Sequence, residues 1–134
     1  MAIPILTAKF FIPPPPPKAV ARPRLIQRLN QGLSTRSIMT LISAPAGFGK
    51  STLAAEWIAS CGRPAAWLSL DAGDHEPGRF LVYFIHALRL ISPDLGSGLL
   101  DELQSSGVAS IQPVLTTLLN EITAIPQDFI LVLD

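Results

Sequence analysis

The chain has 134 residues, 49% of them hydrophobic, which is enough apolar material for the core of one ordinary domain. Ten basic and ten acidic residues give a net charge of zero, which argues against a domain that binds a polyanion through a basic face. A single cysteine excludes a disulfide framework and favours a reducing compartment. No apolar run approaches the roughly 20 residues that span a bilayer. We therefore expect a cytoplasmic protein with no membrane partner and no secretory signal.

The charges are divided unevenly along the chain. Residues 1–50 hold seven Lys and Arg and no acid, whereas residues 51–134 hold three Lys and Arg and all ten acids. Either the basic part helps to surround a polyphosphate, or the two parts neutralise each other when they pack. The charge pattern alone favours neither interpretation.

Residues 1–23 are expected to form an irregular leader. An uninterrupted proline run at 13–17 favours a stiff polyproline II segment without backbone donors. Such a run can be a ligand for SH3-type domains, but nothing else in the chain indicates signalling, so a wrapping or spacer segment is favoured. Apolar residues at helical spacing between Leu25 and Leu33 then predict a first helix, which Pro23 is suited to begin.

The most informative stretch is IMTLISAPAGFGKS, which runs from Ile38 to Ser51. Its apolar start, up to Ser43, predicts a buried strand, and a helix is expected to begin at Lys50 after a glycine-containing loop. A strand, a glycine-rich loop and a helix in this order are the setting of a phosphate-binding P-loop, or Walker A motif. The pattern G-x-x-x-x-G-K-[ST] asks for glycine where this chain has Ala44, a small residue that such loops accept.

The chemistry of a P-loop assigns a role to each part of this segment. Glycines let backbone N–H groups converge, and the N-terminus of a helix attracts anions. Lys50 would reach the β- and γ-phosphates, and the Ser51 hydroxyl would ligate Mg²⁺. The alternative is a glycine-containing turn that only happens to precede Lys-Ser. We expect ATP or ADP with Mg²⁺, held by Ala46, Gly47, Phe48, Gly49, Lys50, Ser51 and Thr52.

Strands and helices are expected to alternate through the rest of the chain. Strands are predicted at 65–70 and 129–133, and helices at 50–60, 79–91 and 113–125, with at most a short helix within 92–109. The polar turn DAGDHEP at 71–77 carries acids that we expect to be mainly solvated and to cap the helix that follows. This alternation indicates an α/β fold with a largely parallel sheet.

The last strand carries the second half of the expected site. Four apolar residues, 130–133, are followed by Asp134, which matches a Walker B element. Ligands of open α/β sheets bind at the carboxyl ends of the strands, where this carboxylate would lie. Asp134 would hold Mg²⁺ directly or through water and, with Lys50, would serve phosphoryl transfer. The motif is weak alone, but its position after a P-loop strengthens it.

Four segments together carry a family resemblance: LTAKFFIPPPPPKAVARPRL (6–25), SAPAGFGKSTLAAEW (43–57), AWLSLDAGDHEPGRFLVYFIHAL (66–88) and LVLD (131–134). They resemble the nucleotide-binding domain of MalT-like regulators, the large ATP-dependent LuxR-family transcription activators within the STAND class of P-loop NTPases. The resemblance covers nearly the whole chain. It implies a parallel-sheet P-loop NTPase fold of the STAND/ASCE kind.

The same resemblance implies partners and further site residues. In such proteins ATP binding, helped by an inducer, drives self-association of the full-length protein, and a distant C-terminal helix-turn-helix domain binds promoters. The resemblance also implies that the segment around Val20, Arg22 and Arg24 lies near the adenine. DNA is expected only through that C-terminal domain, because this chain has no helix-turn-helix signature.

The chain departs from the family pattern at its end. An acid usually follows the Walker B aspartate, and here the sequence stops at Asp134, so a group that positions water for hydrolysis is not in view. We expect a fragment, with a proline-rich leader at 1–23 and the first part of a P-loop NTPase domain at 24–134, truncated after Walker B. The family sheet order would place a later strand between the P-loop and Walker B strands. The fragment alone is therefore expected to be aggregation-prone.

Three functions are compatible with these features. The first is an ATP-binding, slowly hydrolysing switch of a signal-responsive transcriptional activator, with ATPase activity in the full protein rather than in the fragment. The second is a nucleotide-gated interaction module without significant turnover. The third is a metabolic P-loop kinase, which needs an acceptor-binding segment, and residues 71–76 are its only candidate.

Overall fold

The computed structural model describes residues 4–14, 16–18, 20–35, 39–105 and 111–134. They form two compact units, which we describe separately. Unit 1 comprises Met1–Phe11 with Pro64–Asp134, and unit 2 comprises Ile12–Arg63. None of the helices formed by the described residues has the length and apolar character needed to cross a membrane.

Unit 1 contains a parallel sheet of two strands, β1 (Ala65–Leu68) and β2 (Ile130–Leu133), with Ala65 opposite Ile130 and Leu68 opposite Leu133. Both strands are the apolar runs predicted from the sequence. Parallel strands need a long crossover, and three helices supply it between them. These helices are α3 (Pro77–Arg89), α4 (Ser97–Ser105) and α5 (Ile111–Thr123).

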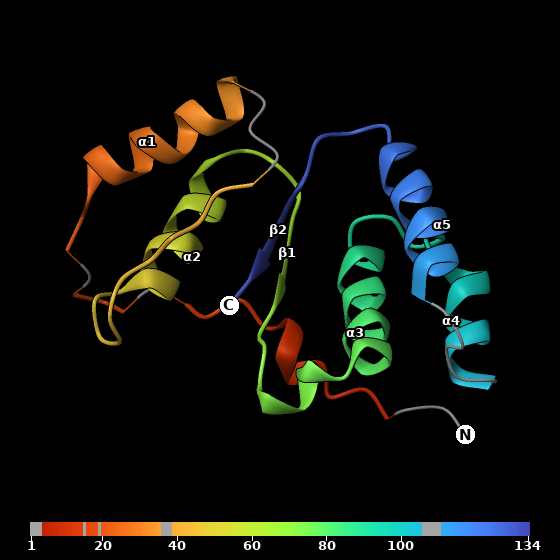
Figure 1. Ribbon diagram of the computed structural model, residues 1–134. Helices are drawn as coiled ribbons and strands as arrows, with labels where there is room; N and C mark the ends of the chain where they lie inside the picture. Colours follow the sequence, from red (N-terminus) through yellow and green to blue (C-terminus); the bar gives the residue numbers. More distant parts are fainter. Residues whose placement is uncertain (1–3, 15, 19, 36–38, 106–110) are drawn as a thin grey trace. The chain divides into compact units, whose positions relative to one another are not determined.

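Helix α3 provides most of the core of unit 1. It lies between the sheet and the pair formed by α4 and α5 (Figure 1). The largest fully buried side chains come from α3 and β1, because an apolar face of the helix packs against a strand that is apolar along its length. They are Trp67, Tyr83, Leu68, Ile85, Leu88 and Val82. The prediction of an α/β fold is confirmed at this level.

Unit 1 contains two short 3-10 helices in segments that were predicted to have no helix. The first, η1 (Thr7–Phe10), lies in the leader that we expected to be irregular. The second, η2 (Ala72–His75), lies in the polar turn, where Asp71 and Asp74 form a capping box. These acids cap η2 rather than α3, and the Asp74 side chain is only 4% exposed, so the expectation of a solvated turn is wrong for that residue.

Unit 2 contains two helices at the predicted places, α1 (Pro23–Ser34) and α2 (Lys50–Ser60). Pro23 stands in the first turn of α1, where its missing N–H costs no hydrogen bond. The two helices contact each other through polar as well as apolar groups: the indole Nε1 of Trp57 donates to Oδ1 of Asn30 at 2.9 Å.

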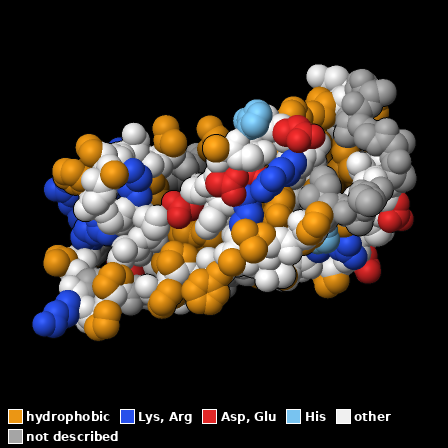
Figure 2. All heavy atoms as spheres, turned by 90° about the horizontal axis from the view of Figure 1, so that it is seen from below, with side chains coloured by type: hydrophobic (Ala, Val, Ile, Leu, Met, Phe, Trp, Pro, Cys, Tyr) orange, Lys and Arg blue, Asp and Glu red, His pale blue; other side chains and the backbone are white. Residues whose placement is uncertain are grey.

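The prediction of a strand at Ile38–Ser43 is wrong for the residues that the structure describes. Residues 39–45 have no regular secondary structure, and Met39 and Leu41 are each 83% exposed. Ile38 lies outside the described residues. A strand depends on hydrogen bonds to a neighbouring strand, and the sheet found in the described residues consists of β1 and β2 alone. Figure 2 shows how widely hydrophobic side chains are distributed over one face of the molecule.

Candidate functional site

The loop that precedes α2 has the backbone conformation expected of a phosphate-binding loop. Gly47 has φ 88° and Gly49 has φ 77°, both in the left-handed region that favours glycine. Gly49 is also the N-cap of α2. A Cβ added at Gly49 would lie 3.0 Å from Nη2 of Arg22, so this guanidinium lies close to the loop backbone, while the left-handed φ is what favours glycine there.

The first turn of α2 presents backbone donors beside this loop. The helical ladder begins with the Leu53 N–H, which donates to the carbonyl of Gly49 at 2.9 Å. The N–H groups of Lys50 and Thr52 lie in the same first turn, ahead of that ladder. The first turn carries no acidic residue that would repel an anion. A phosphate at this place would meet backbone N–H groups of the first turn and the positive end of the helix dipole.

The predicted P-loop lysine folds back onto its own loop. The ammonium of Lys50 donates a hydrogen bond to the carbonyl of Ala44, the position where the motif usually has glycine. This contact keeps the positive charge beside the loop. Ser51 and Thr52 follow in the first turn of α2, and both are partly buried.

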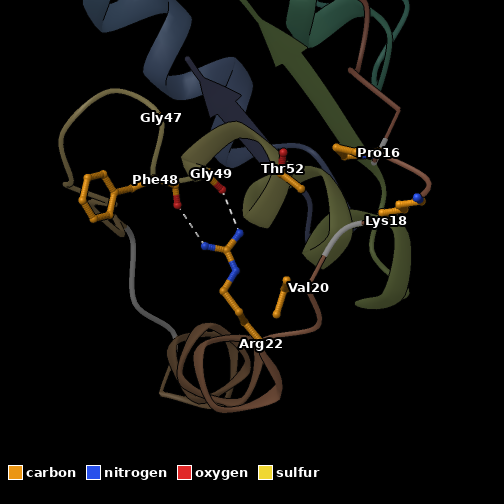
Figure 3. A pocket seen from close by; sticks show the side chains of 8 residues that line it. All are labelled: Pro16, Lys18, Val20, Arg22, Gly47, Phe48, Gly49 and Thr52. Carbon is orange, nitrogen blue, oxygen red and sulfur yellow. Dashed lines mark hydrogen bonds between the residues drawn. The ribbon is translucent and has the colours of Figure 1, made fainter.

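Arg22 approaches the same loop from the start of α1. Its Nη1 donates to the carbonyl of Phe48 at 3.1 Å, and its Nη2 donates to the carbonyl of Gly49 at 2.9 Å (Figure 3). The structure thus brings Arg22 to the predicted P-loop, 27 residues away in the sequence. Its expected place near an adenine stays a prediction. Arg24 is exposed on α1.

A pocket of about 330 Å³ opens between the leader and the loop, within the size range of small-molecule sites. Figure 3 shows leader residues on one side of it and the loop with the first turn of α2 on the other. It is lined by Pro16, Lys18, Val20, Arg22, Gly47, Phe48, Gly49 and Thr52. The sequence analysis did not single out Pro16 or Lys18, although the basic excess of residues 1–50 was a signal for the lysine.

Asp134 lies directly after β2, as predicted. Its N–H donates to the carbonyl of Leu68 at 3.0 Å, and its carbonyl accepts from the N–H of Leu70 at 2.7 Å. The backbone of Asp134 thereby extends the parallel ladder beyond the last strand residue. Asp134 belongs to unit 1, whereas the predicted P-loop belongs to unit 2.

Magnesium in nucleotide sites is usually held by one or two carboxylates together with phosphate oxygens. Nowhere in the described part of the chain do three or more His, Cys, Asp or Glu side chains gather into a possible metal site. Metal binding by Ser51 and metal binding by Asp134 both stay predictions.

Unit 1 contains a charge cluster that the sequence analysis missed. Lys9 is 4% exposed, and its ammonium lies 3.0 Å from Oδ2 of Asp71 and 2.5 Å from Oδ2 of Asp74. It also lies 4.7 Å from the centre of the Tyr83 ring. Burial acts to lower the pKa of Lys9, but the hydrogen bonds and charges of the two aspartates outweigh it and raise that pKa. The available signal was a lone lysine within the apolar run LTAKFF.

The chain is similar in sequence to a protein kinase and to transcriptional regulators. The chain is 40% identical over 106 residues to the serine/threonine-protein kinase PknK of Mycobacterium tuberculosis (strain CDC 1551 / Oshkosh), a match that covers 77% of this chain and 9% of that protein. It is 34% identical over 115 residues to the HTH-type transcriptional regulator MalT of Cronobacter sakazakii, covering 86% of this chain and 12% of the regulator. The MalT of Serratia proteamaculans is 44% identical over 73 residues, covering 54% and 8%.

The chain is similar to MalT-like regulators. These matches support the resemblance found from the sequence segments, while no family model matches the chain. The chain spans about a tenth of the length of the curated relatives it matches.

Proposed function

We propose that this chain is the nucleotide-binding part of a switch in a signal-responsive transcriptional regulator, with ATP or ADP and Mg²⁺ as its ligands. The observation that supports it best is the loop at 44–52, where two left-handed glycines lead into a helix whose first turn carries no acid. Lys50 and Arg22 add two positive charges at the loop backbone. Backbone donors, a helix N-terminus and cations are the groups that bind a polyphosphate.

In this proposal each residue acts on the phosphates or the metal. The Lys50 ammonium exchanges the carbonyl of Ala44 for phosphate oxygens, and the N–H groups of residues 46–52 cradle the oxygens. Ser51 would ligate the Mg²⁺ ion of the bound nucleotide, and the metal role of Asp134 in unit 1 stays a separate prediction. Phosphoryl transfer is slow in this proposal, and positioning with charge neutralisation would supply its rate.

The regulatory part of the proposal rests on the similarity to proteins named as HTH-type transcriptional regulators. We propose that nucleotide binding controls self-association of the full-length protein and that a domain outside this chain binds DNA. We propose that the protein acts in the cytoplasm, where nucleotide and promoter are both available.

A kinase function has less support. One relative is named a serine/threonine-protein kinase, but this sequence contains neither H-R-D nor D-F-G, and its glycine loop has the Walker A form. In the only candidate for an acceptor segment, 71–76, the carboxylates of Asp71 and Asp74 already bind Lys9 and cap η2. A nucleotide-gated module without turnover differs from the proposed switch only in its hydrolysis rate.

Calorimetric titration of the 134-residue chain with Mg-ATP and Mg-ADP tests the proposal. We expect saturable binding of both nucleotides, loss of that binding in Lys50→Ala, and unchanged binding in Arg28→Ala, a matched loss of one exposed positive charge on α1. Circular dichroism checks that each variant keeps its helices. Equal affinity of the wild-type and Lys50→Ala chains, or no binding at millimolar nucleotide by a folded wild-type chain, would refute the proposal.

A further inference from the structure

We propose that Arg22 is a positioning residue of the P-loop, which turns two of its peptide groups so that their N–H groups face a bound polyphosphate. This inference rests on the proposed function. It assigns to Arg22 a role toward the loop backbone rather than toward the base of the nucleotide.

A single guanidinium group binds two consecutive carbonyls of the loop. Nη1 of Arg22 donates to the oxygen of Phe48 at 3.1 Å, and Nη2 donates to the oxygen of Gly49 at 2.9 Å. Figure 3 shows both bonds running from the same planar group to the backbone of the loop. The rigid fork of arginine suits this two-pronged contact, whereas the single ammonium of a lysine does not.

Peptide geometry converts this contact into an orientation of the amides. In a planar trans peptide the C=O and N–H bonds point in opposite directions. The carbonyl of Phe48 shares its peptide group with the N–H of Gly49, and the carbonyl of Gly49 shares its group with the N–H of Lys50. Because both carbonyls face Arg22, both N–H groups face away from it, as donors to a phosphate at the loop.

The loop needs such a restraint because its glycines leave it free to adopt other conformations. Gly47 and Gly49 are both left-handed here, but glycine populates several backbone regions at little cost. Without a restraint, orienting the amides would cost conformational entropy when a phosphate binds. Arg22 supplies this orientation for the Phe48–Gly49 peptide and reinforces the Leu53 N–H at the Gly49–Lys50 peptide, before the ligand arrives.

Arg22 is itself held in place within unit 2. It is the N-cap of α1, and its carbonyl accepts hydrogen bonds from the N–H groups of Leu25 at 3.1 Å and Ile26 at 3.2 Å. Helix α1 is tied to α2 through Trp57 and Asn30. The guanidinium also packs closely on the loop, since a Cβ at Gly49 would lie 3.0 Å from Nη2. The restraint and the helix that it serves are therefore parts of one compact unit.

The test compares Mg-ATP with magnesium tripolyphosphate, a ligand that has no base, on the 134-residue chain. In Arg22→Ala we expect the affinity for both ligands to fall by the same factor, on the order of tenfold, as for the loss of charge-assisted hydrogen bonds. In Arg22→Lys the loss persists, because one ammonium cannot hold both carbonyls. Added methylguanidinium partly restores binding to Arg22→Ala, and the matched control Arg28→Ala binds both ligands as wild type does.

Three results would overturn the inference. Weaker binding of ATP with unchanged binding of tripolyphosphate would make Arg22 a base contact. Full affinity in Arg22→Lys would reduce its role to charge, and full affinity in Arg22→Ala would leave it none. If Arg22→Ala loses its helical circular dichroism signal, Arg22→Lys carries the test. A wild-type chain that binds neither ligand would instead contradict the proposed function, whereas binding lost only in Lys50→Ala would contradict this inference alone.

Discussion

The ammonium of Lys9 lies 2.5 Å from the carboxylate of Asp74, and the two residues are 65 positions apart in the sequence. Both side chains are almost fully buried, at 5% and 4% exposure. The backbone reinforces the contact, because the N–H of Ser69 donates to the carbonyl of Lys9 at 2.8 Å. The part of the leader around Lys9 is thus held against the segment that follows β1.

Replacing Lys9 by Met is expected to destabilise unit 1. Removing one partner of a buried ion pair leaves the other charge without compensation, and we expect a loss of about 3 kcal/mol in the free energy of unfolding. Urea unfolding followed by circular dichroism measures it. The control Lys18→Met removes an exposed lysine and is expected to change stability by less than about 0.5 kcal/mol. Equal stabilities of the two variants would show that the ion pair is not important for the fold.

The same pair predicts how stability depends on pH. Burial acts to raise the pKa of Asp74, but hydrogen bonds from Lys9 and the Asp71 N–H outweigh it and hold that pKa below its usual value. A lowered carboxylate pKa stabilises the fold above the unfolded-state value, about 3.9, and this contribution is lost as the pH falls through the folded-state pKa. The urea concentration at the unfolding midpoint of the wild type should therefore decrease as the pH is lowered below about 4. In Asp74→Asn the urea midpoint should decrease less over the same pH range. Equal decreases in the wild type and in Asp74→Asn would contradict the assignment of this pH dependence to Asp74.

Gly96 is expected to tolerate no side chain. It has φ 69°, and an added Cβ would lie 2.6 Å from Cγ2 of Ile85, a fully buried side chain of α3. Left-handed strain and overpacking together predict that Gly96→Ala costs about 2 to 4 kcal/mol in unfolding free energy. The matched control is Gly98→Ala in α4, which has open space around its Cβ and should gain about 0.5 kcal/mol or more. A Gly96→Ala chain as stable as wild type in urea would refute this account.

A larger part of the fold than of the site geometry follows from sequence. Helix α2 begins at Lys50 and ends at Ser60, as predicted, because local signals fix both ends. The described residues 39–43 of the strand predicted from Ile38 are not a strand, because a strand needs a partner that composition does not reveal. The Lys9 cluster and the contact of Arg22 with the loop depend on side chains that meet across 65 and 27 positions of sequence, which no local pattern encodes.

The central claim is that the loop before α2 binds the phosphates of a nucleotide. Its most direct test is to follow the backbone amide resonances of the 134-residue chain while Mg-ADP is added. The account predicts that the largest shifts occur at the amides of residues 47–52, with saturation, and that Lys50→Ala abolishes them. Shifts confined to other parts of the chain, or no shifts at millimolar Mg-ADP, would contradict it.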